Sequence, residues 1–203
     1  MRTRGIIVIC ALWLLAASGA TWALMKYEST PTASDRAPSL WPAKSLITRA
    51  AGRSTLLMFV HPHCPCSGAS MEELNRLLAR CQGSVTAHVL FVRPKGVADD
   101  WTDTRLKKNA ESIPGVQVSI DAEGQEATLF GAESSGCVIL YDPAGKLLFS
   151  GGITASRGHA GDNAGELAVI DLLNGQSVPL KHTEVYGCSL LGTCETPTNE
   201  NAL

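Results

Sequence analysis

Two cysteines interrupt an apolar run in the stretch Leu56-Leu57-Met58-Phe59-Val60-His61-Pro62-His63-Cys64-Pro65-Cys66-Ser67. The run from Thr55 to Val60 is short and rich in β-favouring side chains, so it predicts a buried strand. From Ser67 to Cys81 the apolar residues recur with a helical period, which predicts a helix. The two cysteines are therefore expected at the junction between a strand and a helix.

Pro65 indicates where this helix begins. Proline suits the first helical position because its missing N–H would have no partner there anyway, so Cys64 is the expected N-cap residue. The Cys64 sulfur would then face the positive end of the helix dipole, which favours the thiolate and lowers the pKa from about 8.5. We therefore expect Cys64 to be the nucleophilic thiol and Cys66 to be the less reactive one.

The segment from Phe59 to Leu74 resembles, without a gap, the active-site segment of membrane-anchored bacterial thioredoxin-like proteins, whose pattern is Phe-Trp-Ala-x-Trp-Cys-x-x-Cys-x-x-Glu-x-Pro-x-Leu. The register matches Cys64 to the family's attacking cysteine and His63 to its tryptophan. Ser67 occupies the position of the resolving cysteine, and Cys66 comes one residue early, which gives a Cys-Pro-Cys-Ser motif. The chain is also similar to the bacterial group labelled RedB.

The resemblance continues in three later segments, at residues 121, 130–131 and 138–146. In this alignment Gly136 falls where the family carries a cis-proline beside the active site. The resemblance implies a thioredoxin-like three-layer α/β/α sandwich with a mixed sheet over residues 45–176. It also implies an activity in thiol–disulfide exchange.

The hydrophobic pattern and the turn residues predict the same layout. The expected order is strand, helix, strand, helix, two hairpin strands and a last helix. These elements are expected at 55–60, 65–83, 86–92, 101–110, 138–141, 146–150 and 163–175. A brief strand at 116–120 is expected to belong to an insertion rather than to the core.

Length and charge limit the functions that the chain can have. It has 203 residues, with 17 Lys and Arg against 19 Asp and Glu, and a net charge of −2. This mixture offers no basic patch, so nucleic acid is not an expected partner. Seven cysteines are too many for casual usage and too few for a disulfide-rich mini-domain, which indicates redox or metal chemistry by some of them.

The N-terminal region predicts a membrane segment. Residues 5–25 form an uncharged, predominantly apolar run long enough to span a bilayer, and Arg2 and Arg4 precede it. We expect residues 1–4 in the cytoplasm, a single-pass signal-anchor in the inner membrane, a linker at 26–44, and the catalytic domain in the periplasm or outside the cell. The alternative is a cleaved signal peptide, because small residues of the right kind occur at 17–23.

The implied function is that of a cell-envelope thiol–disulfide oxidoreductase or isomerase that acts on protein disulfides without a cofactor. Cys64 would attack the client disulfide, and Cys66, a tail cysteine or an external thiol would resolve the mixed disulfide. A Cys64–Cys66 bond closes a very small ring, so strain would make it easily reduced. If Cys66 cannot reach, Ser67 leaves a monothiol centre suited to isomerisation. The expected partners are client proteins with thiols or disulfides, and an electron donor in the membrane or envelope.

Metal handling is the alternative function. Four residues, His61, His63, Cys64 and Cys66, supply two imidazoles and two thiols that suit copper(I) or zinc. A site of this kind would resemble copper-delivering thioredoxin-like chaperones, although their thiols are spaced more widely. The two histidines are otherwise ordinary loop residues. A peroxidase that oxidises Cys64 to sulfenic acid ranks last, because the cysteine arrangement of peroxiredoxins is missing.

The loop at 151–165 adds two candidate residues. It is longer than a link between a hairpin and a helix requires, and in the resembled fold it lies beside the attacking cysteine. Arg157 and His159 are therefore expected to contact substrate or to shift the pKa of Cys64. The other interpretation is a solvated, glycine-rich loop.

The C-terminal tail, residues 177–203, carries Cys188 and Cys194. In an oxidising compartment we expect these two cysteines to be linked as a structural disulfide. The competing role is a relay, in which Cys188 folds back over the active site and serves as the resolving thiol that Ser67 no longer provides.

Overall fold

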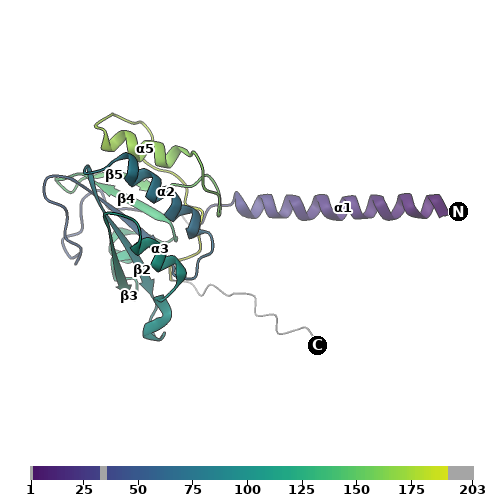
Figure 1. Ribbon diagram of the computed structural model, residues 1–203, viewed down its shortest axis with the longest axis horizontal. Helices are drawn as coiled ribbons and strands as arrows, with labels where there is room; N and C mark the ends of the chain where they lie inside the picture. Colours follow the sequence, from purple (N-terminus) through teal and green to yellow (C-terminus); the bar gives the residue numbers. More distant parts are fainter. Residues whose placement is uncertain (1, 33–35, 192–203) are drawn as a thin grey trace. The chain divides into compact units, whose positions relative to one another are not determined.

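The computed structural model describes residues 2–32 and 36–191 (Figure 1). The chain forms two compact units, Met1–Thr30 and Pro31–Leu203. The first unit contains the single helix α1 (Arg2–Glu28). From Thr3 to Glu28 this helix is long and apolar enough to cross a membrane, with a mean hydropathy of 2.0, but an N-terminal signal sequence has the same properties. The helix itself is predicted correctly, and it runs three residues beyond the expected segment.

The second unit is built on a mixed sheet of five strands in the order β3-β2-β1-β4-β5. The parallel strands are β1 (Ser54–Val60), β2 (Val85–Arg93) and β3 (Val116–Ala122). The strands β4 (Cys137–Tyr141) and β5 (Leu147–Gly151) run antiparallel, with β4 beside β1. The predicted fold class, a thioredoxin-like α/β fold with a mixed sheet, is confirmed.

Helices cover both faces of this sheet. Its helical elements are α2 (Ser67–Arg80), the 3₁₀ helix η1 (Asp99–Thr102), α3 (Arg105–Glu111), α4 (Gln125–Phe130) and α5 (Ala164–Leu173). Side chains of α2, α3 and α5 pack on one face, where Figure 1 shows these three helices together, and side chains of α4 pack on the other. The result is the expected three-layer sandwich.

The central position of β1 explains its continuous apolar sequence. Leu56, Met58 and Val60 point into the core beneath α2 and α5, whereas Leu57 and Phe59 point into the core beneath α4. All five are fully buried. A strand buried on both faces has no polar side, so its sequence reads as an unbroken apolar run.

Two features of the sheet and its helices differ from expectation. The edge strand β3 pairs with β2 along its whole length, so it belongs to the core sheet rather than to an insertion. The helix α4 was not expected, because its six residues are too few for a periodic pattern. It lies between Gly124 and Gly131, both of which adopt positive φ angles.

The domain limits predicted at 45 and 176 are too narrow. Residues 36–44 pack against the α4 face through Trp41, whose ring contacts Phe130 at 4.9 Å and Tyr141 at 5.2 Å between centroids. The segment from 177 to 191 also packs there, and its Val185 and Leu190 are buried in the same core. Isolated apolar residues anchor both segments, so no periodic pattern reveals them in the sequence.

Candidate active site

The Cys-Pro-Cys-Ser motif lies in a turn between β1 and α2. The Cys64 N–H donates to the His61 carbonyl at 3.0 Å, and the Ser67 N–H donates to the Cys64 carbonyl at 3.3 Å. Pro65 is therefore the second residue of a turn, a position that its fixed φ angle favours. The helix begins at Ser67, and its N-cap is Cys66 instead of the predicted Cys64.

The sulfur of Cys64 accepts hydrogen bonds from three other residues. The side chain of Cys188 contributes most to lowering the Cys64 pKa, followed by the Cys66 thiol, the Ser67 hydroxyl and the Cys188 backbone N–H. Burial opposes them, because Cys64 is only 3% exposed, but the pKa still falls far below the ordinary value. The direction agrees with the expectation, whereas the cause is hydrogen bonding rather than N-cap placement.

Cys66 keeps its proton. Its pKa is raised, first because its thiol donates a hydrogen bond to the Cys64 thiolate, and second because it is partly buried. The guanidinium of Arg157 lies against the Cys66 sulfur and acts in the opposite direction. The hydrogen bond between the two cysteines therefore favours the thiolate on Cys64 and the thiol on Cys66.

The segment around Cys188 is held beside the motif by backbone pairing. The Ser135 N–H donates to the Cys188 carbonyl at 2.8 Å, and the Leu190 N–H donates to the Glu133 carbonyl at 2.9 Å. Gly187 packs directly on the Ser135 carbonyl, and this close contact leaves no room for a side chain at position 187. The structure thus places Cys188 at the active site, as the relay alternative requires, and Cys194 lies outside the described residues.

Ser135, which the sequence did not single out, connects several parts of the site. Its hydroxyl accepts from the His61 N–H at 2.8 Å and shares a hydrogen bond with the Ser67 hydroxyl at 2.7 Å. The next residue, Gly136, donates its N–H to the Phe59 carbonyl at 2.8 Å and has a φ of +90°. A proline ring cannot adopt this φ, so the glycine is required in this backbone path.

The two histidines make separate contacts. His61 is fully buried, and its Nδ1 accepts from the His63 N–H at 3.2 Å. Burial lowers the pKa of His61, although the neighbouring Cys64 charge opposes this effect. The His63 Nε2 bonds to the Trp101 carbonyl at 2.9 Å, and the His63 and Trp101 rings lie 4.2 Å apart between centroids.

These contacts bear on the metal alternative. Within residues 2–32 and 36–191, no group of three or more His, Cys, Asp or Glu side chains is arranged to hold a metal ion. One nitrogen of each motif histidine is already engaged by the protein. The described residues therefore do not assemble His61, His63, Cys64 and Cys66 into a metal site.

The loop at 151–165 contributes Arg157 to the site but not His159. The Arg157 guanidinium donates to the Gly187 carbonyl and to the Thr32 hydroxyl, in addition to its contact with Cys66. His159 is exposed, and its Nδ1 bonds to the Arg157 carbonyl at 2.8 Å. Farther along the loop, the Gly161 N–H donates to the buried Glu73 carboxylate at 2.6 Å, which fixes the loop to α2.

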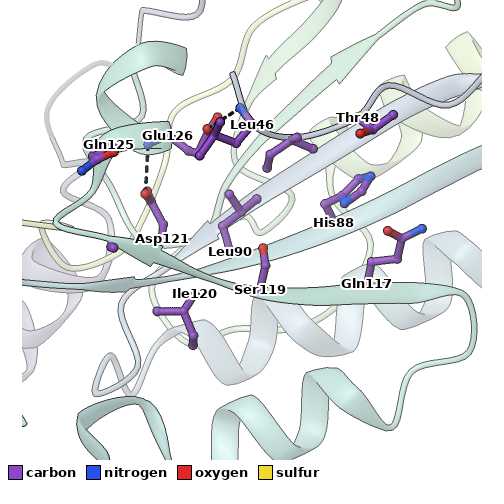
Figure 2. A pocket seen from close by; sticks show the side chains of 12 residues that line it. Leu46, Thr48, His88, Leu90, Gln117, Ser119, Ile120, Asp121, Gln125 and Glu126 are labelled. Carbon is purple, nitrogen blue, oxygen red and sulfur yellow. Dashed lines mark hydrogen bonds between the residues drawn. The ribbon is translucent and has the colours of Figure 1, made fainter. Parts of the chain in front are cut away.

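An open groove of about 310 Å³ borders Cys64. Its walls come from the motif and from the start of α3, namely Pro62, His63, Cys64, Pro65, Gly68, Thr104, Arg105, Leu106 and Asn109. A larger cavity of about 390 Å³ is lined by residues of β2, β3 and α4 and contains no cysteine (Figure 2). There the Asp121 carboxylate accepts from the Glu126 N–H at 2.9 Å, which caps α4.

This chain is similar to known proteins in fold alone. No protein-family model matches the sequence, and no curated protein matches it. A hypothetical protein from Sinorhizobium meliloti 1021 is similar in structure, with 19% identity over 81% of this chain and 99% of that chain and a TM-score of 0.62. An uncharacterised conserved protein from Geobacillus kaustophilus shares 19% identity over 82% of this chain and 94% of that chain, with a TM-score of 0.59.

A secreted disulfide oxidoreductase from Mycobacterium tuberculosis is more distant. It shares 17% identity over 62% of this chain and 83% of that chain, with a TM-score of 0.43. The relation to the RedB group stays a prediction.

Proposed function

We propose that the chain is a thiol–disulfide oxidoreductase or isomerase of the cell envelope that acts on protein disulfides. One observation carries the proposal: the Cys64 sulfur receives hydrogen bonds from Cys188, Cys66 and Ser67 at the wall of an open groove. A thiolate is the nucleophile of disulfide exchange, and these donors favour the thiolate. The groove lets a client disulfide reach it.

In the first step the Cys64 thiolate attacks one sulfur of a client disulfide. A bond forms between Cys64 and that sulfur, the client disulfide breaks, and the second client sulfur leaves as a thiolate. A further thiol then attacks the Cys64 sulfur and releases the first client sulfur. Cys66 is one candidate for that thiol and lies within hydrogen-bonding distance of Cys64.

Residues outside the thiols have supporting roles in this proposal. Ser67 and Ser135 orient the motif through their shared hydrogen bond. Arg157 holds the Cys66 side chain and the Gly187 carbonyl together. His63 packs against Trp101 and forms one wall of the groove in which the client would lie.

The location is part of the same proposal. The apolar helix α1 would act as a single-pass anchor in the inner membrane, with the thiol site in the periplasm or outside the cell. An electron donor or acceptor in the membrane or envelope would then reset the thiols. The proposal needs no metal or organic cofactor, since the cysteines themselves carry the electrons.

The test is reduction of insulin by the full chain in detergent, with dithiothreitol as the electron source. We expect Cys64→Ser to lower the rate to that of dithiothreitol alone. Cys81→Ala is the matched control, because Cys81 is buried at the end of α2 and does not line the groove. Equal rates for the unmodified chain and Cys64→Ser would refute the proposed function.

A further inference from the structure

The strongest unassigned feature of the site is the approach of Cys188 to Cys64. The two residues are 124 positions apart in the sequence. Both the side chain and the backbone N–H of Cys188 nevertheless bond to the Cys64 sulfur. These two contacts fix the Cys188 sulfur next to the atom that would carry a client in a mixed disulfide.

The backbone that carries Cys188 is held from both sides. An isolated antiparallel bridge joins Ser189 to Ser134, and the Cys188 carbonyl accepts from the Ser135 N–H at 2.8 Å. On the preceding side, the Gly187 carbonyl accepts from Arg157 and from the Thr32 hydroxyl. The Cys188 thiol is therefore held beside Cys64 by backbone contacts on both sides of it.

Cys66 is less suited to close the same bond. Only Pro65 separates it from Cys64, so their disulfide would close a very small ring around a residue with a fixed φ angle. Cys66 also has helical backbone angles, and its carbonyl accepts from the Ala69 N–H at 3.3 Å. Closing the ring would disturb both this bond and the turn between Cys64 and Ser67.

We propose that Cys188 is the resolving cysteine of this site and forms the redox-active disulfide with Cys64, while Cys66 remains a thiol. This inference rests on the proposed function, in which Cys64 takes up the client.

The electrons and protons balance in two steps. First, the Cys64 thiolate and the client disulfide become a Cys64–client disulfide and a client thiolate. Then the Cys188 sulfur attacks Cys64, a Cys64–Cys188 disulfide forms, the Cys64–client disulfide breaks, and the proton of the Cys188 thiol leaves with the client sulfur that was bound to Cys64. The client disulfide gains two electrons, and the two protein cysteines lose them. The reverse sequence oxidises a client dithiol.

A symmetrical aromatic disulfide, dithiobis(nitrobenzoate), separates these two steps in the full chain in detergent. Attack by Cys64 releases one coloured thionitrobenzoate, and resolution by a second protein thiol releases another. The variants are made in a Cys10→Ala, Cys194→Ser background, in which Cys81 and Cys137 are buried and burial raises the pKa of Cys81, whereas the pKa of Cys64 is lowered. We expect two thionitrobenzoates for each reagent molecule in this background and in Cys66→Ser, and one in Cys188→Ser.

Serine at position 188 keeps a hydrogen-bond donor to Cys64, so the first release is expected to proceed at a similar rate in Cys188→Ser. The opposite pattern, with one release in Cys66→Ser and two in Cys188→Ser, would overturn the inference. So would two releases in both variants. Failure of Cys64 to form any mixed disulfide would refute the proposed function instead, and the two failures are therefore distinguishable.

Peptide mapping of the unmutated chain gives an independent readout. Trypsin places Cys64 and Cys66 together on peptide 54–76, and Cys188 and Cys194 together on peptide 182–203, so fragmentation of the linked peptides by tandem mass spectrometry assigns the bonded cysteine in each. After one equivalent of reagent we expect these two peptides to be linked. A bond confined to peptide 54–76, or confined to peptide 182–203, would contradict the inference.

Discussion

Replacement of Cys188 by alanine should raise the pKa of Cys64. The Cys188 side chain is the largest contributor to the lowered pKa, and alanine removes it while leaving the backbone N–H in place. A hydrogen bond to a charged group contributes about 1.5–3 kcal/mol. Since one pKa unit corresponds to about 1.36 kcal/mol, the expected rise is about 1–2 units.

The rate of alkylation by iodoacetamide, measured against pH, reports the ionisation of Cys64. The measurement uses the Cys10→Ala, Cys194→Ser background, so that Cys64 is the main reactive thiol. Cys188→Ser is the matched control, because its hydroxyl also donates a hydrogen bond, and it should shift the pKa much less than alanine does. An unchanged pKa in Cys188→Ala, or equal shifts in the two variants, would show that the Cys188 side chain does not stabilise the thiolate.

Three further predictions concern stability and redox potential. Gly187→Ala should cost about 1–3 kcal/mol of unfolding free energy in urea, because its Cβ meets the Ser135 carbonyl, whereas Gly68→Ala, with open space around it, should not destabilise the fold. Ser67→Ala should lower the potential of the Cys64 couple by about 30–60 mV in glutathione buffers, because it removes a donor that stabilises the reduced thiolate; an unchanged potential would exclude that role. Glu166 is buried beside Glu73, and burial first and the Glu73 charge second raise its pKa. Because its pKa is raised in the folded state, Glu166 contributes stability at acidic pH that is lost as the pH rises through the pKa of the folded state. Glu166→Gln should therefore make the free energy of unfolding at pH 8 higher relative to that at pH 5 than it is in the unmodified chain. The same difference between the two pH values in both proteins would count against this prediction.

The sequence predicts the central part of the fold because periodicity there is strong. The run from Leu56 to Val60 is apolar on both faces, and α2 has a clear apolar stripe, so both elements and their junction are found correctly. The start of α2 is wrong by two residues, since a proline fits both a first helical position and a turn. The helix α4 is missed because its six residues show no period.

The sequence reveals only the part of the candidate site whose residues are adjacent along the chain. Cys64, Cys66 and Ser67 are adjacent along the chain, so their spacing reveals them. Cys188 reaches Cys64 only through pairing of its backbone with residues 133–135, and no local pattern predicts such a long-range contact. The glycine before Cys188 is a sequence feature that could have indicated close backbone approach, because glycine allows it without a side-chain clash.

The donors around Cys64 also bear on the direction of electron flow. They bond to the thiolate, which exists only in the reduced protein, so they stabilise the reduced form relative to any disulfide of Cys64. Because the folded pKa lies below the unfolded value of about 8.5, this stabilisation grows as the pH rises toward that value and is lost as the pH falls through the folded pKa. A stabilised reduced form makes the corresponding disulfide a stronger oxidant. In the proposed function, the same hydrogen bonds therefore favour oxidation of client thiols, or rearrangement of client disulfides, over reduction of client disulfides.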